Sequence, residues 1–247
     1  MDETPPAREQ EGATRRDLMR QAACLAGACA AGAWPAPAIS ARPAPSYARA
    51  QIVDAQGGAL TTRQLAAAGT AWIFNYPYAA SPAFLIALDA PPVATELASE
   101  AQRRYSAPAG VGPQRSIVAF SAICAHKLVY PTPQISFIGL RAGQGDEPGQ
   151  VIHCCGDQSR YDPTHGARVI GGPAPQPLAA VLLEWDPKTD QLYAIGVRGG
   201  DRFEAFFDKY GFKLELELGA RARALAGATA TAKPASAYSR QRQSCRA

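Results

Sequence analysis

The feature that most constrains the fold of this chain is a pair of cysteine-bearing segments separated by 27 residues. The first is Cys124-Ala-His126, and the second begins at Cys154-Cys155 and runs on to Ser159-Arg-Tyr161-Asp-Pro. A lone Cys-x-His is a weak signal. The same box ahead of a Cys-Cys pair and a Ser-x-Tyr-Asp-Pro run is much stronger, and a site that uses both requires a fold that brings the two segments together.

The first 38 residues have the features of an export signal. Arg15-Arg16, followed by Asp-Leu-Met, resembles the twin-arginine motif of exported folded proteins. The apolar run at 22–34 has 13 residues, fewer than the roughly 18–20 that span a bilayer. Ala36-Pro-Ala38 fits a small-residue cleavage site. We therefore predict a twin-arginine signal over 1–38 and a periplasmic location, with weak inner-membrane association if the signal stays uncleaved.

The six cysteines do not suggest a disulfide framework. Cys24 and Cys29 lie within the expected signal, and Cys245 lies near the C-terminus. Three cysteines remain in the part expected to fold, which is an odd number for an exported chain. In an oxidising compartment such cysteines indicate metal ligation or a reactive thiol.

The charge of the chain is unevenly distributed. Residues 51–218 carry 13 basic and 16 acidic side chains, whereas 219–247 carry six basic and no acidic ones. A nucleic-acid-binding protein would place its basic patch on the folded domain, so we exclude that class of partner. The segment 219–247 is rich in Ala, Arg, Ser and Gln and is predicted to be disordered, and the Pro- and Ala-rich stretch 39–50 is predicted to be a linker.

Short apolar runs bounded by Gly, Pro and Asp recur from residue 51 onwards and predict an all-β domain over 51–218. One helix is expected at 60–68. A short C-terminal helix is expected at 201–210, where aromatic residues recur at helical spacing and are expected to face the core. The predicted strands are 71–74, 83–88, 116–121, 135–140, 150–153, 179–184 and 191–197.

Together, the two cysteine segments resemble the cluster-binding boxes of the Rieske iron–sulfur family. The resemblance covers roughly residues 70–200, includes the Pro-rich stretch 171–178, and extends furthest with the small subunit of arsenite oxidase. It implies a [2Fe–2S] cluster in which two thiolates hold one iron and two imidazoles hold the other. It also implies an antiparallel β-sandwich or barrel with a small cluster-binding subdomain at about 120–178.

The second segment departs from the family pattern, because no histidine stands where the second imidazole belongs. In the family, a serine and a tyrosine follow the ligand cysteine by five and seven residues. Counting back from Ser159 and Tyr161 makes Cys154 the ligand and places Asp157 at the histidine position. This spacing favours Cys154 with Asp157.

A second register remains open. If one residue is deleted from the segment, Cys155 becomes the ligand and Gln158 takes the histidine position. Under the first register, Gly156 and Val129 stand where the family carries the cysteines of a disulfide between the two loops, so both halves of that disulfide are missing together.

The resemblance thus assigns roles to seven residues. A carboxylate in place of an imidazole adds a negative charge, so we expect a low reduction potential for this class of cluster. The candidate metal ligands are Cys124, His126, Cys154, Cys155 and Asp157, and the residues that would donate hydrogen bonds to sulfur are Ser159 and Tyr161.

The two other histidines are poorer candidates. His153 is expected to face away from Cys154, because neighbouring residues of a strand point to opposite sides. His165 lies in a Thr-His-Gly turn and is expected to be exposed to solvent.

The expected function is periplasmic transfer of single electrons. The partner would be a catalytic subunit or quinol on one side and a soluble cytochrome c-like carrier on the other. We see no nucleophile elbow or phosphate loop, so an electron-transfer subunit is favoured over an enzyme acting alone. Two alternatives stay open: a domain of this fold that has lost its cluster and serves structure or assembly, and a zinc site of Cys124, His126, Cys154 and Cys155.

Overall fold

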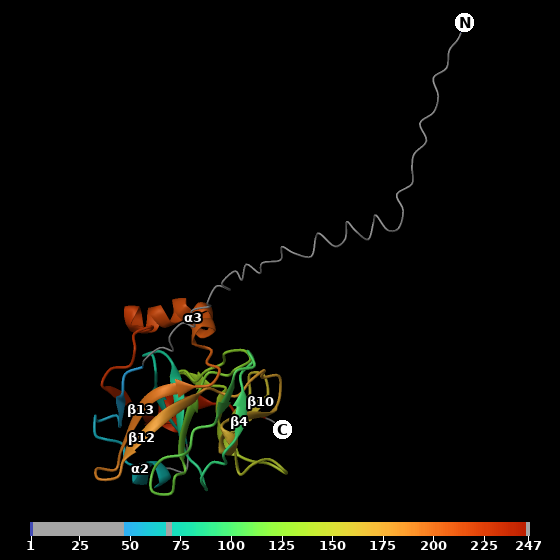
Figure 1. Ribbon diagram of the computed structural model, residues 1–247. Coiled ribbons are helices and arrows are strands. Elements are labelled where there is room, and N and C mark those ends of the chain that lie inside the picture. The colour runs from blue at the N-terminus through green and yellow to red at the C-terminus, as the bar shows by residue number, and fades with distance from the viewer. Residues whose placement is uncertain (2–46, 68–70, 246–247) are drawn as a thin grey trace. The chain divides into compact units, whose positions relative to one another are not determined.

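The computed structural model describes Met1, residues 47–67 and residues 71–245 (Figure 1). The expected signal, apart from Met1, and most of the expected linker lie outside these residues. Within the described part of the chain, no helix is both long and apolar enough to cross a membrane.

The main sheet has eight strands, and all its pairings are antiparallel except that of β1 with β14. Its two edge strands, β14 and β15, are separated in sequence only by Ala232, so the sheet is nearly closed into a barrel. In order across the sheet, the strands are β14 (Thr229–Thr231), β1 (Ala50–Val53), β13 (Gln191–Arg198), β12 (Ala180–Asp186), β6 (Ile117–Ser121), β3 (Pro82–Ala87), β2 (Trp72–Asn75) and β15 (Lys233–Pro234).

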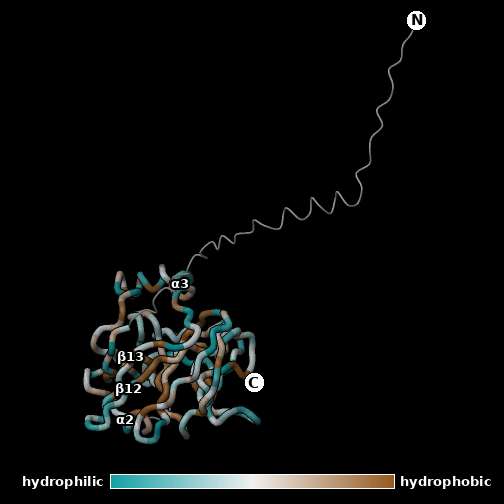
Figure 2. Tube along the Cα trace, in the orientation of Figure 1, coloured by the Kyte–Doolittle hydropathy of each residue, from teal (hydrophilic) through white to brown (hydrophobic). Residues whose placement is uncertain are grey.

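Strands β3 and β6 are apolar along almost their whole length because both of their faces are buried. Leu85 and Ala119 face one core together with β1 and β13, whereas Phe84 and Phe120 face another. The second core also contains Tyr161 from a smaller sheet. Continuous apolar runs are expected for strands covered on both faces, and Figure 2 shows apolar segments within the folded domain and hydrophilic ones at its outer loops.

The smaller sheet carries the second cysteine segment. Its four strands pair antiparallel in the order β11 (Arg168–Gly171), β10 (Ser159–Asp162), β9 (Gln150–Cys154) and β8 (Ile138–Ala142). The segment forms the turn between β9, which ends at Cys154, and β10, which begins at Ser159. The all-β prediction is therefore confirmed, and the smaller sheet falls within the range expected for a small subdomain.

Helix α3 (Phe203–Leu218) is longer than the predicted helix at 201–210. As predicted, its aromatic stripe faces the core: Phe206 packs edge-on against Tyr130, with ring centroids 4.9 Å apart. Lys209 donates a hydrogen bond to the carbonyl oxygen of Lys127. The helix therefore packs against the first cysteine segment.

The remaining elements are α2 (Thr62–Ala67), β4 (Glu96–Ala98), β5 (Arg104–Ser106), β7 (Ile135–Ser136), η1 (Pro163–His165), η2 (Gly219–Arg221), α4 (Ala235–Tyr238) and β16 (Gln241–Arg242).

The structure differs from the predicted boundaries at both ends of the domain. Arg49 pairs with Glu184, and β1 begins at Ala50, so the end of the expected linker belongs to the fold. The expectation of disorder over 219–247 is wrong for 219–245. This segment adds β14 and β15 to the main sheet and pairs β16 in parallel with β7.

A disulfide between Cys155 and Cys245 joins the C-terminal segment to the turn between β9 and β10. The two cysteines lie 90 positions apart, so the bond removes much conformational freedom from the unfolded chain. We expect the double variant Cys155→Ser, Cys245→Ser to lose about 2–5 kcal/mol in free energy of unfolding, measured by urea denaturation without reductant. A loss below about 0.5 kcal/mol, the usual size of a surface substitution, would contradict a stabilising role.

Candidate metal centre

The first cysteine segment forms a tight turn after β6. The N–H of Leu128 donates to the carbonyl oxygen of Cys124 at 3.0 Å, and the N–H of Cys124 donates to that of Val129 at 2.8 Å. Leu128 has a φ of 61°, in the left-handed region that side chains other than Gly, Asn and Asp seldom adopt.

The second segment repeats this backbone conformation. The N–H of Gln158 donates to the carbonyl oxygen of Cys154 at 2.7 Å, and Gln158 has a φ of 63°. In each turn, the left-handed residue follows a cysteine by four positions. This equivalence pairs Cys154 with Cys124 and favours the first register, in which Asp157 takes the histidine position.

The two turns bring four potential ligands together. The Oδ2 atom of Asp157 lies 3.2 Å from the Sγ of Cys124 and 3.2 Å from the Nδ1 of His126. The ligand atoms of Cys124, Cys154 and Asp157 all lie within 4.8 Å of one another. Both thiols are buried and the Asp157 side chain is 1% exposed, whereas that of His126 is 34% exposed. His126 is thus the edge of the site that solvent can reach.

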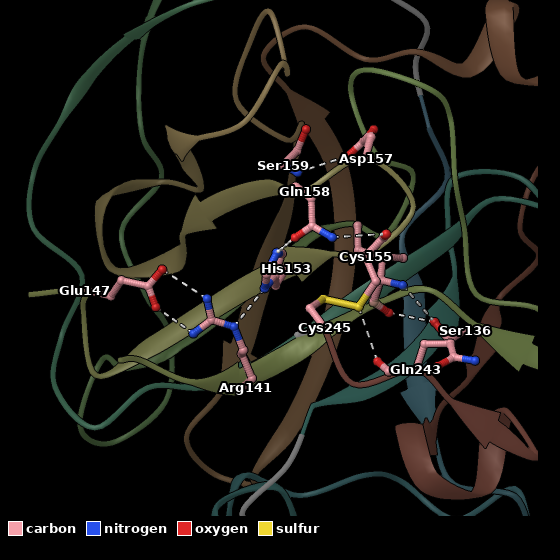
Figure 3. Close-up of a disulfide and its surroundings, with 11 residues drawn as sticks. Ser136, Arg141, Glu147, His153, Cys155, Asp157, Gln158, Ser159, Gln243 and Cys245 are labelled. Atoms are coloured by element: carbon pink, nitrogen blue, oxygen red, sulfur yellow. Dashed lines mark hydrogen bonds and ion pairs between the residues drawn. A yellow bond between two sulfur atoms is a disulfide. The ribbon is translucent and has the colours of Figure 1, made fainter. Parts of the chain in front are cut away.

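Cys155 is not part of this group. Its sulfur is bonded to Cys245, so the expectation that it offers a thiolate is wrong (Figure 3). Gln158, its counterpart in the second register, accepts a hydrogen bond from His153 and donates one to the carbonyl oxygen of Cys155. Both members of the second register therefore have other partners, and a zinc site that includes Cys155 is excluded in this disulfide-bonded form.

Tyr161 and Ser159 lie beside the buried thiols. The Tyr161 hydroxyl is 3.2 Å from the Sγ of Cys124 and accepts a hydrogen bond from the N–H of Ala125 at 3.1 Å, so its proton is free for the sulfur. The Ser159 hydroxyl is fully buried and has no hydrogen-bond partner among the described residues. A buried hydroxyl without an acceptor costs about 1–3 kcal/mol, so this position favours an acceptor from outside the described part of the chain.

Val129 and Gly156 face each other across the two turns. A Cβ atom added at Gly156 would lie 2.9 Å from a methyl carbon of Val129 and 3.7 Å from the Sγ of Cys154. These are the positions at which the first register puts the family's inter-loop disulfide. The glycine leaves room for the valine, so an apolar contact joins the two turns where that disulfide would be.

Hydrogen bonds within the site shift the pKa values of its two thiols in opposite directions and lower that of Asp157. A hydrogen bond from Cys154, and a second from Tyr161, lower the pKa of Cys124 in spite of its burial. The pKa of Cys154 is raised, because this thiol donates that bond and is itself buried. Burial favours protonation of Asp157, but the Ser159 N–H and the two thiols together hold its pKa below the ordinary value. The site thus favours ionisation of Cys124 over that of Cys154, and Asp157 is a carboxylate at neutral pH.

The other two imidazoles lie away from the thiols. His153 faces the opposite side of β9, as expected from strand alternation: its Nδ1 accepts from the Nε of Arg141 at 2.9 Å. Burial, followed by the positive charge of Arg141, lowers the pKa of His153. His165 was expected to be exposed to solvent, but it is half-buried, with its Nδ1 atom 2.7 Å from the Oδ2 atom of Asp162. No sequence pattern had pointed to the contact of His153 with Gln158, or to the left-handed turns.

Arg141 also forms a two-point ion pair with Glu147, which Arg160 shares. Hydrogen bonds from Arg141, and then from Arg160, lower the pKa of Glu147 from 4.5 to about 2. The carboxylate therefore stabilises the fold above pH 4.5, and this contribution is lost as the pH falls toward 2.

We expect Glu147→Gln to lower the free energy of unfolding by about 1–3 kcal/mol at pH 7 and by clearly less at pH 3, measured in urea. The control is Glu215→Gln, which makes the same change of charge at an exposed position of α3. If Glu147→Gln lowered the free energy of unfolding equally at pH 7 and pH 3, this role of Glu147 would be contradicted.

No family model matches the chain. Among solved structures, the chain is similar to the soluble domain of Rieske protein II from Sulfolobus acidocaldarius. The identity is 22% and the TM-score 0.45, over 75% of this chain and 96% of that one.

Proposed function

We propose that this protein is a Rieske-type electron-transfer protein whose [2Fe–2S] cluster is held by Cys124, Cys154, His126 and Asp157. The observation that carries the proposal is the convergence of two thiols, an imidazole and a carboxylate from two turns of the same backbone form. A [2Fe–2S] cluster needs four such ligands, and the Rieske type takes them from two chemically different pairs.

The residues of the site fit this group. The unpartnered hydroxyl of Ser159 and the free proton of Tyr161 are donors at buried positions beside the thiols, where sulfur would accept hydrogen bonds. When bound, the cluster supplies single-electron oxidation and reduction. Among the described residues, both thiols and Asp157 are buried, and His126 is the proposed ligand that stays open to a partner.

Asp157 gives the proposed site one more negative charge than the family pattern has. It is an anion in a position where the family has a neutral imidazole, and its negative charge opposes the arrival of an electron. The same substitution removes one of the two imidazoles that quinol oxidation would use as hydrogen-bond partners. We therefore favour exchange of electrons with a protein, either a catalytic subunit or a cytochrome c-like carrier, in the periplasm.

A second candidate is a single metal ion such as zinc. Its support is that Cys124 and His126 both lie 3.2 Å from the same oxygen of Asp157. Ligand atoms this close can share one tetrahedral ion, and Cys, His and Asp are all zinc ligands.

Metal and sulfide analysis separates these candidates. A cluster gives two iron atoms and two acid-labile sulfides per chain, visible absorption, and an electron paramagnetic resonance (EPR) signal after reduction. Zinc gives one metal ion, no sulfide and no colour. If the protein is matured in a host that makes iron–sulfur clusters and contains neither metal, both proposals fail and the structural role remains.

A further inference from the structure

A cavity of about 630 Å³ lies between β8 and the C-terminal segment, near the disulfide. Arg141 from β8 and Arg240 and Arg242 from the C-terminal segment line it, together with His153. No Asp or Glu is among its lining residues, all of which belong to the described part of the chain. Glu147 does not line this cavity but lines two other hollows, one of which shares Arg141 and His153 with it.

The two arginines of the C-terminal segment are held in place by the backbone. The N–H of Arg240 donates to the carbonyl oxygen of Pro133 at 3.0 Å, and β16 continues this pairing along β7. Residues two apart in a strand point to the same side, so Arg240 and Arg242 both face the cavity. Three residues further on, the bond to Cys155 anchors the segment (Figure 3).

The positive charges around this cavity are not balanced. Within residues 47–67 and 71–245, neither Arg240 nor Arg242 forms an ion pair with a carboxylate. Arg141 has Glu147, which it shares with Arg160. Like charges fixed on the wall of one cavity repel one another, and an anion between them removes that repulsion.

We propose that this cavity binds a small organic anion carrying two or more carboxylate or phosphate groups. Guanidinium groups bind both kinds of group through paired hydrogen bonds. The volume lies within the range of about 300–1,000 Å³ usual for small-molecule sites. Ile73, Ile138 and Leu140 supply an apolar floor for a carbon framework, which a bare inorganic ion would not use.

The test is isothermal titration calorimetry on the full chain at about 0.15 M salt, near physiological ionic strength. The probes are citrate for carboxylates, glycerol 2-phosphate for organic phosphates, and sulfate as an anion without carbon. We expect saturable binding of citrate or glycerol 2-phosphate, tighter than that of sulfate, and the better probe shows which acidic group the site prefers. The measurement needs no metal, so it succeeds or fails independently of the proposed function.

Two pairs of variants locate the binding. Arg240→Gln with Arg242→Gln should weaken binding at least tenfold. Arg221→Gln with Arg223→Gln makes the same change of charge elsewhere on the C-terminal segment and should weaken it less than twofold.

Gly139→Leu fills the cavity without changing charge. A Cβ atom at Gly139 meets nothing within 4 Å, and this residue lines the cavity, so the variant should fold and lose binding. Gly227→Leu, at an equally open position outside the cavity, should bind normally. Absence of saturable binding by citrate and glycerol 2-phosphate, equal losses in both arginine pairs, or full binding by Gly139→Leu would overturn the proposal.

Discussion

Cys124→Ser should reduce the iron and sulfide content of the purified protein to background and abolish the EPR signal of the reduced form. Cys124 is buried, hydrogen bonds from Cys154 and Tyr161 lower its pKa, and its sulfur lies 3.2 Å from the Oδ2 atom of Asp157. Serine keeps the shape of the side chain but does not ionise near neutral pH, so one iron loses an anionic ligand. No other thiol in the described part of the chain can replace it, because Cys154 is already a ligand and Cys155 is bonded.

The control is Cys155→Ser combined with Cys245→Ser. It removes two sulfur atoms, one of them from the same turn as Cys154, but neither belongs to the proposed ligand set. This variant should keep its iron while losing stability. Full iron in Cys124→Ser, or loss of iron in the control with the fold intact by circular dichroism, would contradict the assignment of ligands.

The strands were the most predictable part of the fold, because their signal is local. The apolar runs at 83–88 and 116–121 correspond to β3 and β6, which are buried on both faces and so leave an unbroken pattern in the sequence. The aromatic stripe of α3 was predictable for the same reason. Its length was not, because beyond Tyr210 the helix exposes Phe212 and Leu216 and its periodicity fades.

The C-terminal segment could not be predicted from its composition. Strands β14 to β16 are two or three residues long: β14 and β15 join the main sheet, and β16 pairs with β7 alone. These pairings rest on the backbone, so they leave no apolar pattern in the sequence. Ala232 is buried among strands, yet alanine at that position looks like the rest of an Ala-rich tail. The partner of Cys155 was equally hidden, since nothing in the sequence links two cysteines 90 positions apart.

Sequence spacing located the candidate site but left its register open. The number of residues between the cysteine and Ser159 and Tyr161 favoured Cys154 over Cys155 as the ligand. The structure adds a reason that counting could not supply: the left-handed residues Leu128 and Gln158 make the two turns equivalent. Sequence reasoning takes a left-handed position to be glycine or asparagine, so neither residue gave a signal.

Asp157→His should raise the reduction potential of the bound cluster by on the order of 100–300 mV. The range is about half the gap between clusters with four thiolates and those with two imidazoles, because one anionic ligand rather than two becomes neutral. The Asp157 side chain is almost fully buried, so water screens its charge poorly. The measurement is a redox titration followed by EPR, on wild type and variant at one pH.

Gln158→His is the matched control for this substitution. It introduces the same imidazole one residue further on, where the native side chain faces His153 and Cys155 rather than the thiols. With Asp157 still in place, the potential should stay within about 30 mV of wild type, which corresponds to less than 1 kcal/mol for one electron. If instead Gln158→His raised the potential and Asp157→His only abolished the cluster, Cys155 would be the ligand, and the disulfide to Cys245 would have to open when the cluster is inserted.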